Sequence, residues 1–292
     1  MEWWIVLAAM ILALLIVVVY SIVMPYRKRK LKIAVFDLDE TLGSFTQLGL
    51  LRDVIEGYEN RILSQPEFNK LIDENPEFIR PGIVDILDFV VDKRTKGHCD
   101  AIMIYTNNNG PRSWSESIAK YFDYKVGKPV FDQIICAYKA NGKRVEPLRT
   151  TYDKTYSDLL RCTNLPQGTQ VCFFDDVFHP QMRNNNVHYI NAKGYSNAVP
   201  IEMSISRRCR HNIPLRNSML SYAENVYGGS AIRGKYKSQE EQNVDNVVGK
   251  YMLHRTRDFF NDSVGEPNSR RHNSLLGTKR KQSRLHMDFN QQ

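Results

Sequence analysis

Short apolar stretches alternate with helical patterns through the middle of the chain. Three stretches have the length and composition of buried strands: LKIAVFDL (31–38), AIMIY (101–105) and VCFF (171–174). Apolar residues recur at helical spacing over about 83–94, 113–122 and 154–162, and weaker strands are predicted at 131–136 and 187–190. Buried strands that alternate with helices predict an α/β fold, with a Rossmann-like, mostly parallel sheet flanked by helices on both faces.

The N-terminal pattern differs, because residues 3–24 carry no charge. As a helix they would be roughly 33 Å long, enough to cross a bilayer core. A cleaved signal peptide would have a shorter apolar region preceded by basic residues, whereas here Glu2 precedes the stretch and a basic run, 27–32, follows it. Residues 1–26 are therefore predicted to be a transmembrane anchor. The basic run predicts that the following domain is cytosolic, and it is also a candidate contact for anionic lipid.

The C-terminal third has a weaker pattern. We expect the folded domain to cover 31–200 and treat 201–265 as an unassigned extension, with helix expected near 214–226 and 243–260. Residues 266–292 are polar and basic, which predicts a disordered tail.

The composition and charge of the chain limit the classes of binding partner that we expect. The 292 residues are 42% hydrophobic, enough for a substantial core, and the five scattered cysteines include no C-x-x-C pair, which fits a reducing compartment. The formal charge is +8, but residues 33–269 hold 29 basic and 30 acidic residues. The excess positive charge therefore belongs to the two flanks, and a nucleic-acid partner is not expected.

Acidic residues follow two of the predicted strands. Asp37 and Asp39 stand at the end of the first, with both side chains on the same side of the chain, and Asp175 and Asp176 come after the third. Thr106 follows the second strand. Because parallel strands end at the same sheet edge, these groups are expected to meet there. Carboxylate oxygens suit Mg²⁺, and two neighbouring carboxyls can take separate acid and base roles.

The segments FDLDETL (36–42), IYTNN (104–108) and FFDD (173–176) resemble, in this order, the motifs of the haloacid dehalogenase (HAD) superfamily. The DLDETL form, followed by Arg80-Pro81-Gly82 before the Thr strand, is similar to the NLI-interacting-factor-like phosphatases, which act on phosphoserine and phosphothreonine proteins. The resemblance covers about 33–195. The membrane helix adds a likeness to the Dullard-like members, and FFDDVFHP with VHYI resembles phosphatase-like proteins of large DNA viruses.

The resemblance implies roles for individual residues. Asp37 would be the nucleophile that forms an aspartyl-phosphate, and Asp39 the general acid and base, with its backbone carbonyl on Mg²⁺. Asp175 and Asp176 would complete the metal site, and which of them contacts the ion directly is left open. Thr106 and the backbone N–H of Asn107 would bind the phosphoryl oxygens.

The superfamily also needs a lysine that neutralises the phosphoryl charge. Lys154, at the start of a predicted helix, is the preferred candidate, and Lys139 and Lys143 are the alternatives. His179 follows the last motif but has no second ligand at a zinc spacing, so a structural role is favoured.

The leading hypothesis is a membrane-anchored, Mg²⁺-dependent phosphatase acting on phosphoproteins. Residues 42–79 are too few for a large cap, so an open site that accepts a macromolecule is expected. A nucleotide or nucleic-acid-end phosphatase is one alternative. The other is a catalytically silent membrane scaffold, like the mitochondrial import-translocase subunit that carries a related domain; the presence of both Asp37 and Asp39 argues against it.

Overall fold

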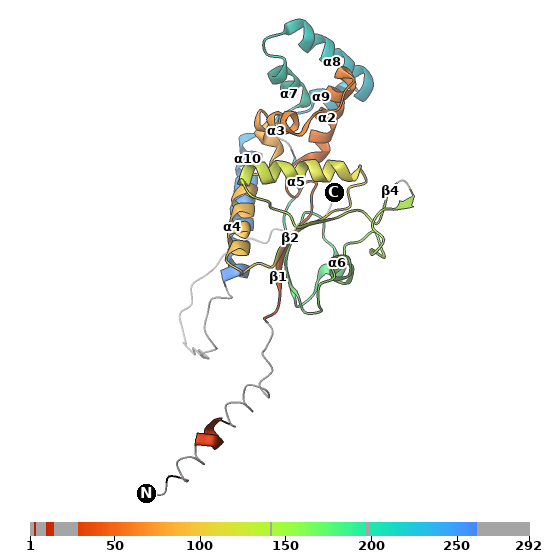
Figure 1. Cartoon of the computed structure of the whole chain (residues 1–292). Helices are drawn as coiled ribbons and strands as arrows, with labels where there is room; N and C mark the ends of the chain where they lie inside the picture. The colour runs from red at the N-terminus through yellow and green to blue at the C-terminus, as the bar shows by residue number, and fades with distance from the viewer. Residues whose placement is uncertain (1–2, 4–9, 15–28, 141, 197–198, 262–292) are drawn as a thin grey trace, which may run out of the picture.

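The computed structural model describes residues 3, 10–14, 29–140, 142–196 and 199–261 (Figure 1). Most of the predicted anchor, residues 27 and 28 of the basic run, and the predicted tail at 266–292 lie outside these residues. Within the described ranges, no helix has both the length and the apolar character needed to cross a membrane. The anchor thus remains a prediction from the sequence.

The domain is built on a five-stranded parallel sheet in the order β3-β2-β1-β6-β7. The strands are β1 (Lys32–Phe36), β2 (Ala101–Tyr105), β3 (Gln133–Ile135), β6 (Gln170–Asp175) and β7 (Val187–Asn191). This confirms the predicted parallel α/β sheet, including both weaker strands. The central strand, β1, lies between β2 and β6, which places the three motif-bearing strands side by side.

Helices cover both faces of the sheet, as the continuous apolar runs predict. Alternate strand residues point to opposite faces: Ala34 and Phe36 lie in one hydrophobic cluster, and Ile33 and Val35 lie in the other. The first cluster is the larger and includes side chains from α4 (Ile83–Thr95), α5 (Arg112–Val126) and α10 (Gln239–Asn261). The second is covered mainly by α6 (Tyr156–Thr163).

The segment after β1 is helical and contains α2 (Phe45–Glu59), α3 (Gln65–Asp73) and the 3-10 turn η1 (Pro76–Phe78). Beyond β3, a short hairpin of β4 (Lys139–Ala140) and β5 (Lys143–Arg144) projects from the body of the domain (Figure 1). A second 3-10 turn, η2 (Pro180–Met182), follows β6. The predicted helices at 83–94 and 113–122 correspond to α4 and α5. The third, α6, begins two residues later than expected, because Thr155 is its N-cap and its hydroxyl accepts the backbone N–H of Asp158 at 2.9 Å.

The stretch beyond residue 200 packs onto the same domain. Helices α7 (Ile201–Arg208), α8 (Ile213–Tyr227) and α9 (Gly229–Arg233) gather at one end, where α7 and α8 contact α2 (Figure 1). The last helix, α10, runs along α4 and also contacts β7. The helices expected near 214–226 and 243–260 correspond to α8 and α10. Met252 and Phe260 of α10 are fully buried in the larger cluster, so this helix is part of the core.

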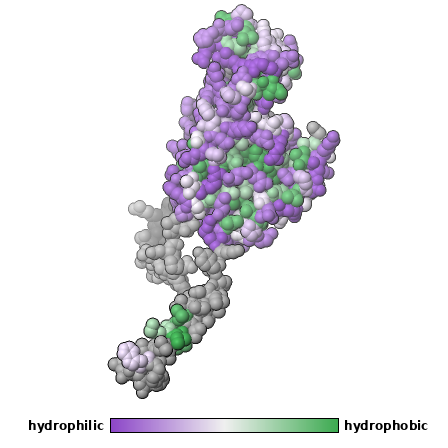
Figure 2. All heavy atoms as spheres, in the orientation of Figure 1, coloured by the Kyte–Doolittle hydropathy of each residue, from purple (hydrophilic) through white to green (hydrophobic). Residues whose placement is uncertain are grey.

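The view in Figure 2 shows a largely hydrophilic surface on which hydrophobic residues form only small groups. The sheet residues that form both clusters are almost completely buried. The helical layers therefore enclose the apolar side chains, and the polar ends of the strands remain available for a site.

Candidate active site

The carboxyl ends of β1, β2 and β6 surround a cavity of about 270 Å³. The backbone N–H of Asp37 donates to the carbonyl of Phe174 at 2.8 Å, which holds the end of β1 against β6. On the other side, the backbone N–H of Thr106 donates to Ile135 at 3.0 Å. The cavity is lined by Asp37, Asp39, Glu40, Thr46, Thr106, Asn107, Asn108, Lys154, Asp175, Asp176, Val177 and His179. Every site residue predicted from the sequence is in this set.

Three carboxylates in the cavity form a group that could hold a metal ion. One oxygen each from Asp37, Asp175 and Asp176 lies within 4.8 Å of the others. Asp175 is almost fully buried and accepts the backbone N–H of Val177 at 2.9 Å, while Asp176 accepts the Thr41 hydroxyl at 3.0 Å. These bonds orient the two side chains.

The donor set fits Mg²⁺, which prefers carboxylate oxygens and retains several waters. Burial raises the pKa of Asp175, with a further increase from the charge of Asp37 and an opposing effect of Lys154. Burial and the charge of Asp37 also raise the pKa of Asp176. The negative charges of these carboxylates therefore repel one another when all are deprotonated. A bound cation would reduce that repulsion.

Lys154 supplies the cation among these carboxylates. Its side chain is buried; the ammonium contacts Asp37 Oδ1 and donates to Asp175 Oδ2 at 2.7 Å. The alternatives, Lys139 and Lys143, lie on the projecting β4–β5 hairpin and do not line the cavity. Lys154 stands just before the N-cap of α6 rather than inside the helix, so the chain entering α6 directs it to the sheet edge.

Asp39 has surroundings unlike those of the three clustered carboxylates. Its Oδ2 accepts the Asn108 amide at 2.7 Å, and its Oδ1 is buried with no hydrogen-bond partner among the described residues. Burial raises the pKa of Asp39 to about 6, with the Asn108 hydrogen bond opposing the shift. This carboxyl can therefore hold and release a proton near neutral pH, as a general acid and base must.

Thr106 is also positioned by Asn108, because its hydroxyl oxygen accepts the backbone N–H of Asn108 at 2.9 Å. The hydroxyl hydrogen is then free to donate toward a group in the cavity. The amide of Asn108 orients Asp39 at the same time. The sequence analysis assigned the backbone N–H of Asn107 to phosphoryl binding, but nothing in the sequence pattern distinguished Asn108.

Arg80 holds the loop that carries Asp39. Its buried guanidinium donates to the carbonyls of Thr41 at 2.7 Å, Glu40 at 2.5 Å and Lys193 at 2.8 Å. Glu40 adopts a left-handed conformation with φ of 57°, which is uncommon for a non-glycine residue and turns the chain after the two aspartates. The Arg80-Pro81-Gly82 segment noted in the sequence thus supports the loop that carries Asp37 and Asp39.

Arg149 is a second buried arginine, and the sequence analysis did not identify it. Its guanidinium donates to the Thr106 carbonyl at 3.0 Å and to Asn107 Oδ1 at 2.7 Å. It also donates to the Tyr152 carbonyl at 3.0 Å, two residues before Lys154. Arg149 therefore joins the loop after β2 to the segment that delivers Lys154. Its sequence context, LRTTY, carries no distinguishing signal.

His179 lines the cavity but is held by its neighbours. Its Nδ1 accepts the backbone N–H of Lys154 at 3.4 Å, and its Nε2 lies 3.5 Å from Asp175 Oδ2. Burial, together with the nearby charge of Lys154, lowers the pKa of His179 to about 4. A neutral imidazole that supports Lys154 agrees with the structural role favoured from the sequence.

Comparison of this chain with protein-family models, with curated proteins and with solved structures found no match. The chemistry of the site must therefore be argued from its own residues.

Proposed function

We propose that the protein is a Mg²⁺-dependent phosphatase that works through an aspartyl-phosphate on Asp37, as the HAD-like motifs imply. The observation that carries this proposal is the environment of Asp37 at the end of the central strand. Its carboxylate contacts Lys154 and lies within 4.8 Å of ligand atoms of both Asp175 and Asp176. An anionic nucleophile between a cation and a candidate metal group suits attack on a phosphate.

In the first half of the proposed reaction, an oxygen of Asp37 attacks phosphorus and the bond from phosphorus to the substrate oxygen breaks. Asp39 gives its proton to the departing oxygen, which leaves as an alcohol. In the second half, Asp39 takes a proton from water, the water oxygen attacks phosphorus, and inorganic phosphate leaves Asp37 in its original state. The carboxyl groups of Asp37 and Asp39 therefore account for both halves of the proposed reaction.

The other residues stabilise and orient the phosphoryl group. Lys154 offsets its negative charge, and the free hydroxyl hydrogen of Thr106 donates to a phosphoryl oxygen. Asp37, Asp175 and Asp176 would hold Mg²⁺, which supplies further positive charge at the phosphate. The cavity holds five carboxyl groups and one ammonium, so an anionic substrate would need that ion.

We further propose that the substrates are phosphoserine and phosphothreonine proteins. The cavity is lined by loops at the sheet edge and by Thr46 of α2, and α7 to α10 contribute none of its lining residues. A site without a large covering element suits a phosphorylated side chain on a macromolecule. The neutral balance of residues 33–269 argues against a nucleic-acid substrate.

The full chain, assayed with p-nitrophenyl phosphate and with a panel of phosphopeptides, tests both parts of the proposal. We expect turnover of both substrate types with Mg²⁺ and its loss with EDTA, recovered on adding excess Mg²⁺. Activity that persists in EDTA would contradict the metal assignment. Hydrolysis of nucleotides with no hydrolysis of phosphopeptides would contradict the substrate class.

A further inference from the structure

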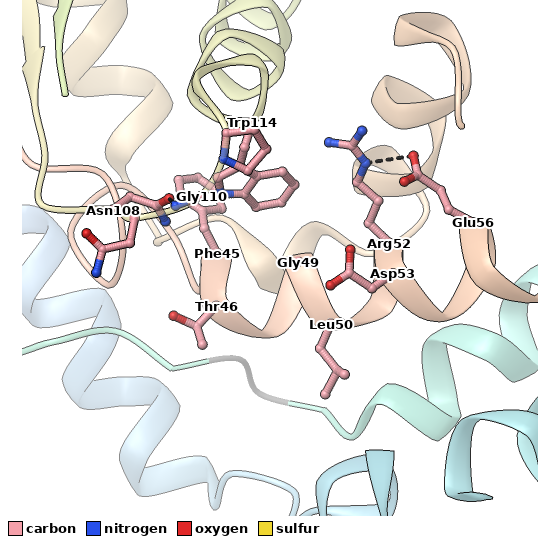
Figure 3. Close-up of a pocket in the computed structure, with 12 residues that line it drawn as sticks. Phe45, Thr46, Gly49, Leu50, Arg52, Asp53, Glu56, Asn108, Gly110 and Trp114 are labelled. Atoms are coloured by element: carbon pink, nitrogen blue, oxygen red, sulfur yellow. Dashed lines mark hydrogen bonds and ion pairs between the residues drawn. The ribbon is translucent and has the colours of Figure 1, made fainter. Parts of the chain in front are cut away.

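A second cavity of about 470 Å³ adjoins the active site (Figure 3). It lies between α2 and the loop leading into α5, and it is lined by Phe45, Thr46, Gly49, Leu50, Arg52, Asp53, Glu56, Asn108, Asn109, Gly110, Pro111 and Trp114. We call this cavity the α2 groove. Thr46 and Asn108 line both the α2 groove and the catalytic cavity. A molecule with its phosphate at Asp37 can therefore extend into the groove.

Gly49 gives the α2 groove its depth. Glycine in a helix interior costs about 1 kcal/mol relative to alanine, so its presence calls for a reason. At Gly57, on the same helix, an added Cβ would overlap the hydroxyl of Tyr222, which explains that glycine by packing. At Gly49 an added Cβ would meet only the indole of Trp114, at an ordinary 3.7 Å. Packing does not require Gly49, and its missing side chain leaves space beside Trp114.

The charges in the α2 groove do not balance. Arg52 donates to Glu56 at 2.7 Å, its guanidinium lies 5.6 Å from the Trp114 ring, and both side chains of this ion pair are largely buried. Asp53 is exposed and accepts no hydrogen bond from another described residue. Partial burial and the charge of Glu56 raise its pKa. Since Arg52 is already paired with Glu56, Asp53 leaves the groove with an excess negative charge.

These features lie on one stripe of α2. Gly49 and Asp53 are four residues apart and therefore on the same helix face, and Thr46 is one turn nearer the active site. Figure 3 shows Trp114 facing Gly49 from the neighbouring element, with Asp53 further along the helix. From the active site outward, the groove therefore presents three parts in order. The first is the polar edge shared with the catalytic cavity, the second is the apolar surface at Gly49 and Trp114, and the third is the carboxylate of Asp53.

We propose that the α2 groove binds the substrate polypeptide beside its phosphorylated residue and selects a lysine or arginine there. The aliphatic stem of such a side chain would lie over Gly49 and against Trp114, with its cationic end at Asp53. This inference rests on the proposed phosphatase function. It adds a specificity determinant that acts on the residues around the phosphate and takes no part in the chemical step.

The test uses the full chain with Mg²⁺ and phosphoserine peptides that differ only by Lys, Ala or Glu at one position, scanned through the three residues on each side. We expect kcat/KM at one of these positions to be about fivefold higher for Lys than for Glu, the size of a partly exposed ion pair. In Asp53→Lys the preference at that position should reverse. The control Asp88→Lys makes the same charge change on an exposed position of α4 and should keep the wild-type preference.

A steric pair tests the shape of the groove independently. Gly49→Leu should lower the ratio of phosphopeptide to p-nitrophenyl phosphate kcat/KM by at least about fivefold, whereas Gly49→Ala, whose single methyl group fills only part of the space beside Trp114, should lower that ratio by a smaller factor. Wild-type protein that cleaves phosphopeptides without preferring Lys, or whose preference survives Asp53→Lys, would overturn the groove proposal alone. Wild-type protein that cleaves neither substrate type would overturn the proposed function itself.

Discussion

Lys154 and Asp175 form a buried ion pair of 2.7 Å at the floor of the candidate active site. The same ammonium contacts Asp37, so two carboxylates from neighbouring strands share one cation. A buried lysine is stable only when a negative charge lies beside it, and here the carboxylates of Asp37 and Asp175 supply that charge. The lysine in turn offsets the negative charges of these two carboxylates. The pair therefore links the stability of the sheet edge to the charge that the proposed reaction requires.

Replacing this lysine should impair the reaction strongly. We expect Lys154→Gln to lower kcat/KM for p-nitrophenyl phosphate by about 10²- to 10³-fold, as for the loss of one preorganised donor at a developing charge. Steady-state kinetics at saturating Mg²⁺ measures the loss. Lys143→Gln, on the exposed β5 strand outside the cavity, is the matched control and should retain wild-type kinetics. Equal effects of the two changes would contradict the role given to Lys154.

Asp37→Asn tests the nucleophile. The change is nearly isosteric but removes the attacking oxygen anion, so turnover and aspartyl-phosphate formation should both be abolished while the fold survives. Phosphate trapping after acid quench measures the intermediate, and circular dichroism checks the fold. Appreciable activity in folded Asp37→Asn would show that another group attacks phosphorus.

The predicted membrane topology rests on the charges around residues 3–24. With the basic run on the cytosolic side, we expect the domain from about residue 31 onward to be digested by protease added to the cytosolic face of sealed vesicles. Immunoblotting for the domain reads the result. Protection of the domain until detergent is added would place it on the other side, and its recovery in the soluble fraction would contradict the anchor.

The sheet and its polar edge could be predicted because each depends on a local pattern. A run such as AIMIY can be buried on both faces only in a covered parallel sheet, and the residues that follow such strands must meet at one edge. Asp37, Thr106 and Asp175 were found in this way. Lys154 could not be identified from the pattern alone, because Lys139 and Lys143 were also candidates. The resemblance to a family that needs a lysine at the site was required as well.

The supporting residues could not be found by that reasoning. Arg149 and Asn108 act through hydrogen bonds to the loops around the cavity, and those bonds depend on tertiary positions that neither spacing nor periodicity encodes. The helix α10 was expected near 243–260, but its packing along α4 depends on a close approach. Gly249 lies against the Pro81 carbonyl, and an added Cβ would overlap that oxygen.

Arg149 should contribute mainly to stability and to the position of Lys154. Its fully buried guanidinium joins three loop segments, so Arg149→Met would leave several carbonyl oxygens without a donor. We expect the free energy of unfolding to fall by about 2–4 kcal/mol, measured by urea denaturation. Arg183→Met, at an exposed position whose side chain has no hydrogen bond to another described residue, is the control and should cost less than about 1 kcal/mol. A similar loss in both variants would contradict the stabilising role given to Arg149.

Asp39→Asn separates the proton transfer from the attack on phosphorus. The variant keeps the nucleophile and the backbone carbonyl at position 39 but loses the group that protonates the departing oxygen. General acid catalysis typically contributes about 10²- to 10⁴-fold, which sets the expected defect with phosphoserine peptides. The first step with p-nitrophenyl phosphate should be affected much less, because p-nitrophenolate leaves without a proton.

The deciding measurement is the ratio of the two substrates' kcat/KM in Asp39→Asn and in wild type, since kcat/KM reports the first irreversible step and not the later attack of water. We expect the ratio of p-nitrophenyl phosphate to phosphoserine peptide to rise at least about tenfold. Asn108→Ala, which removes the donor to Asp39 Oδ2 and leaves the carboxyl in place, should shift the ratio in the same direction by a smaller factor. An equal loss with both substrates in Asp39→Asn would mean that Asp39 organises the site without transferring the proton.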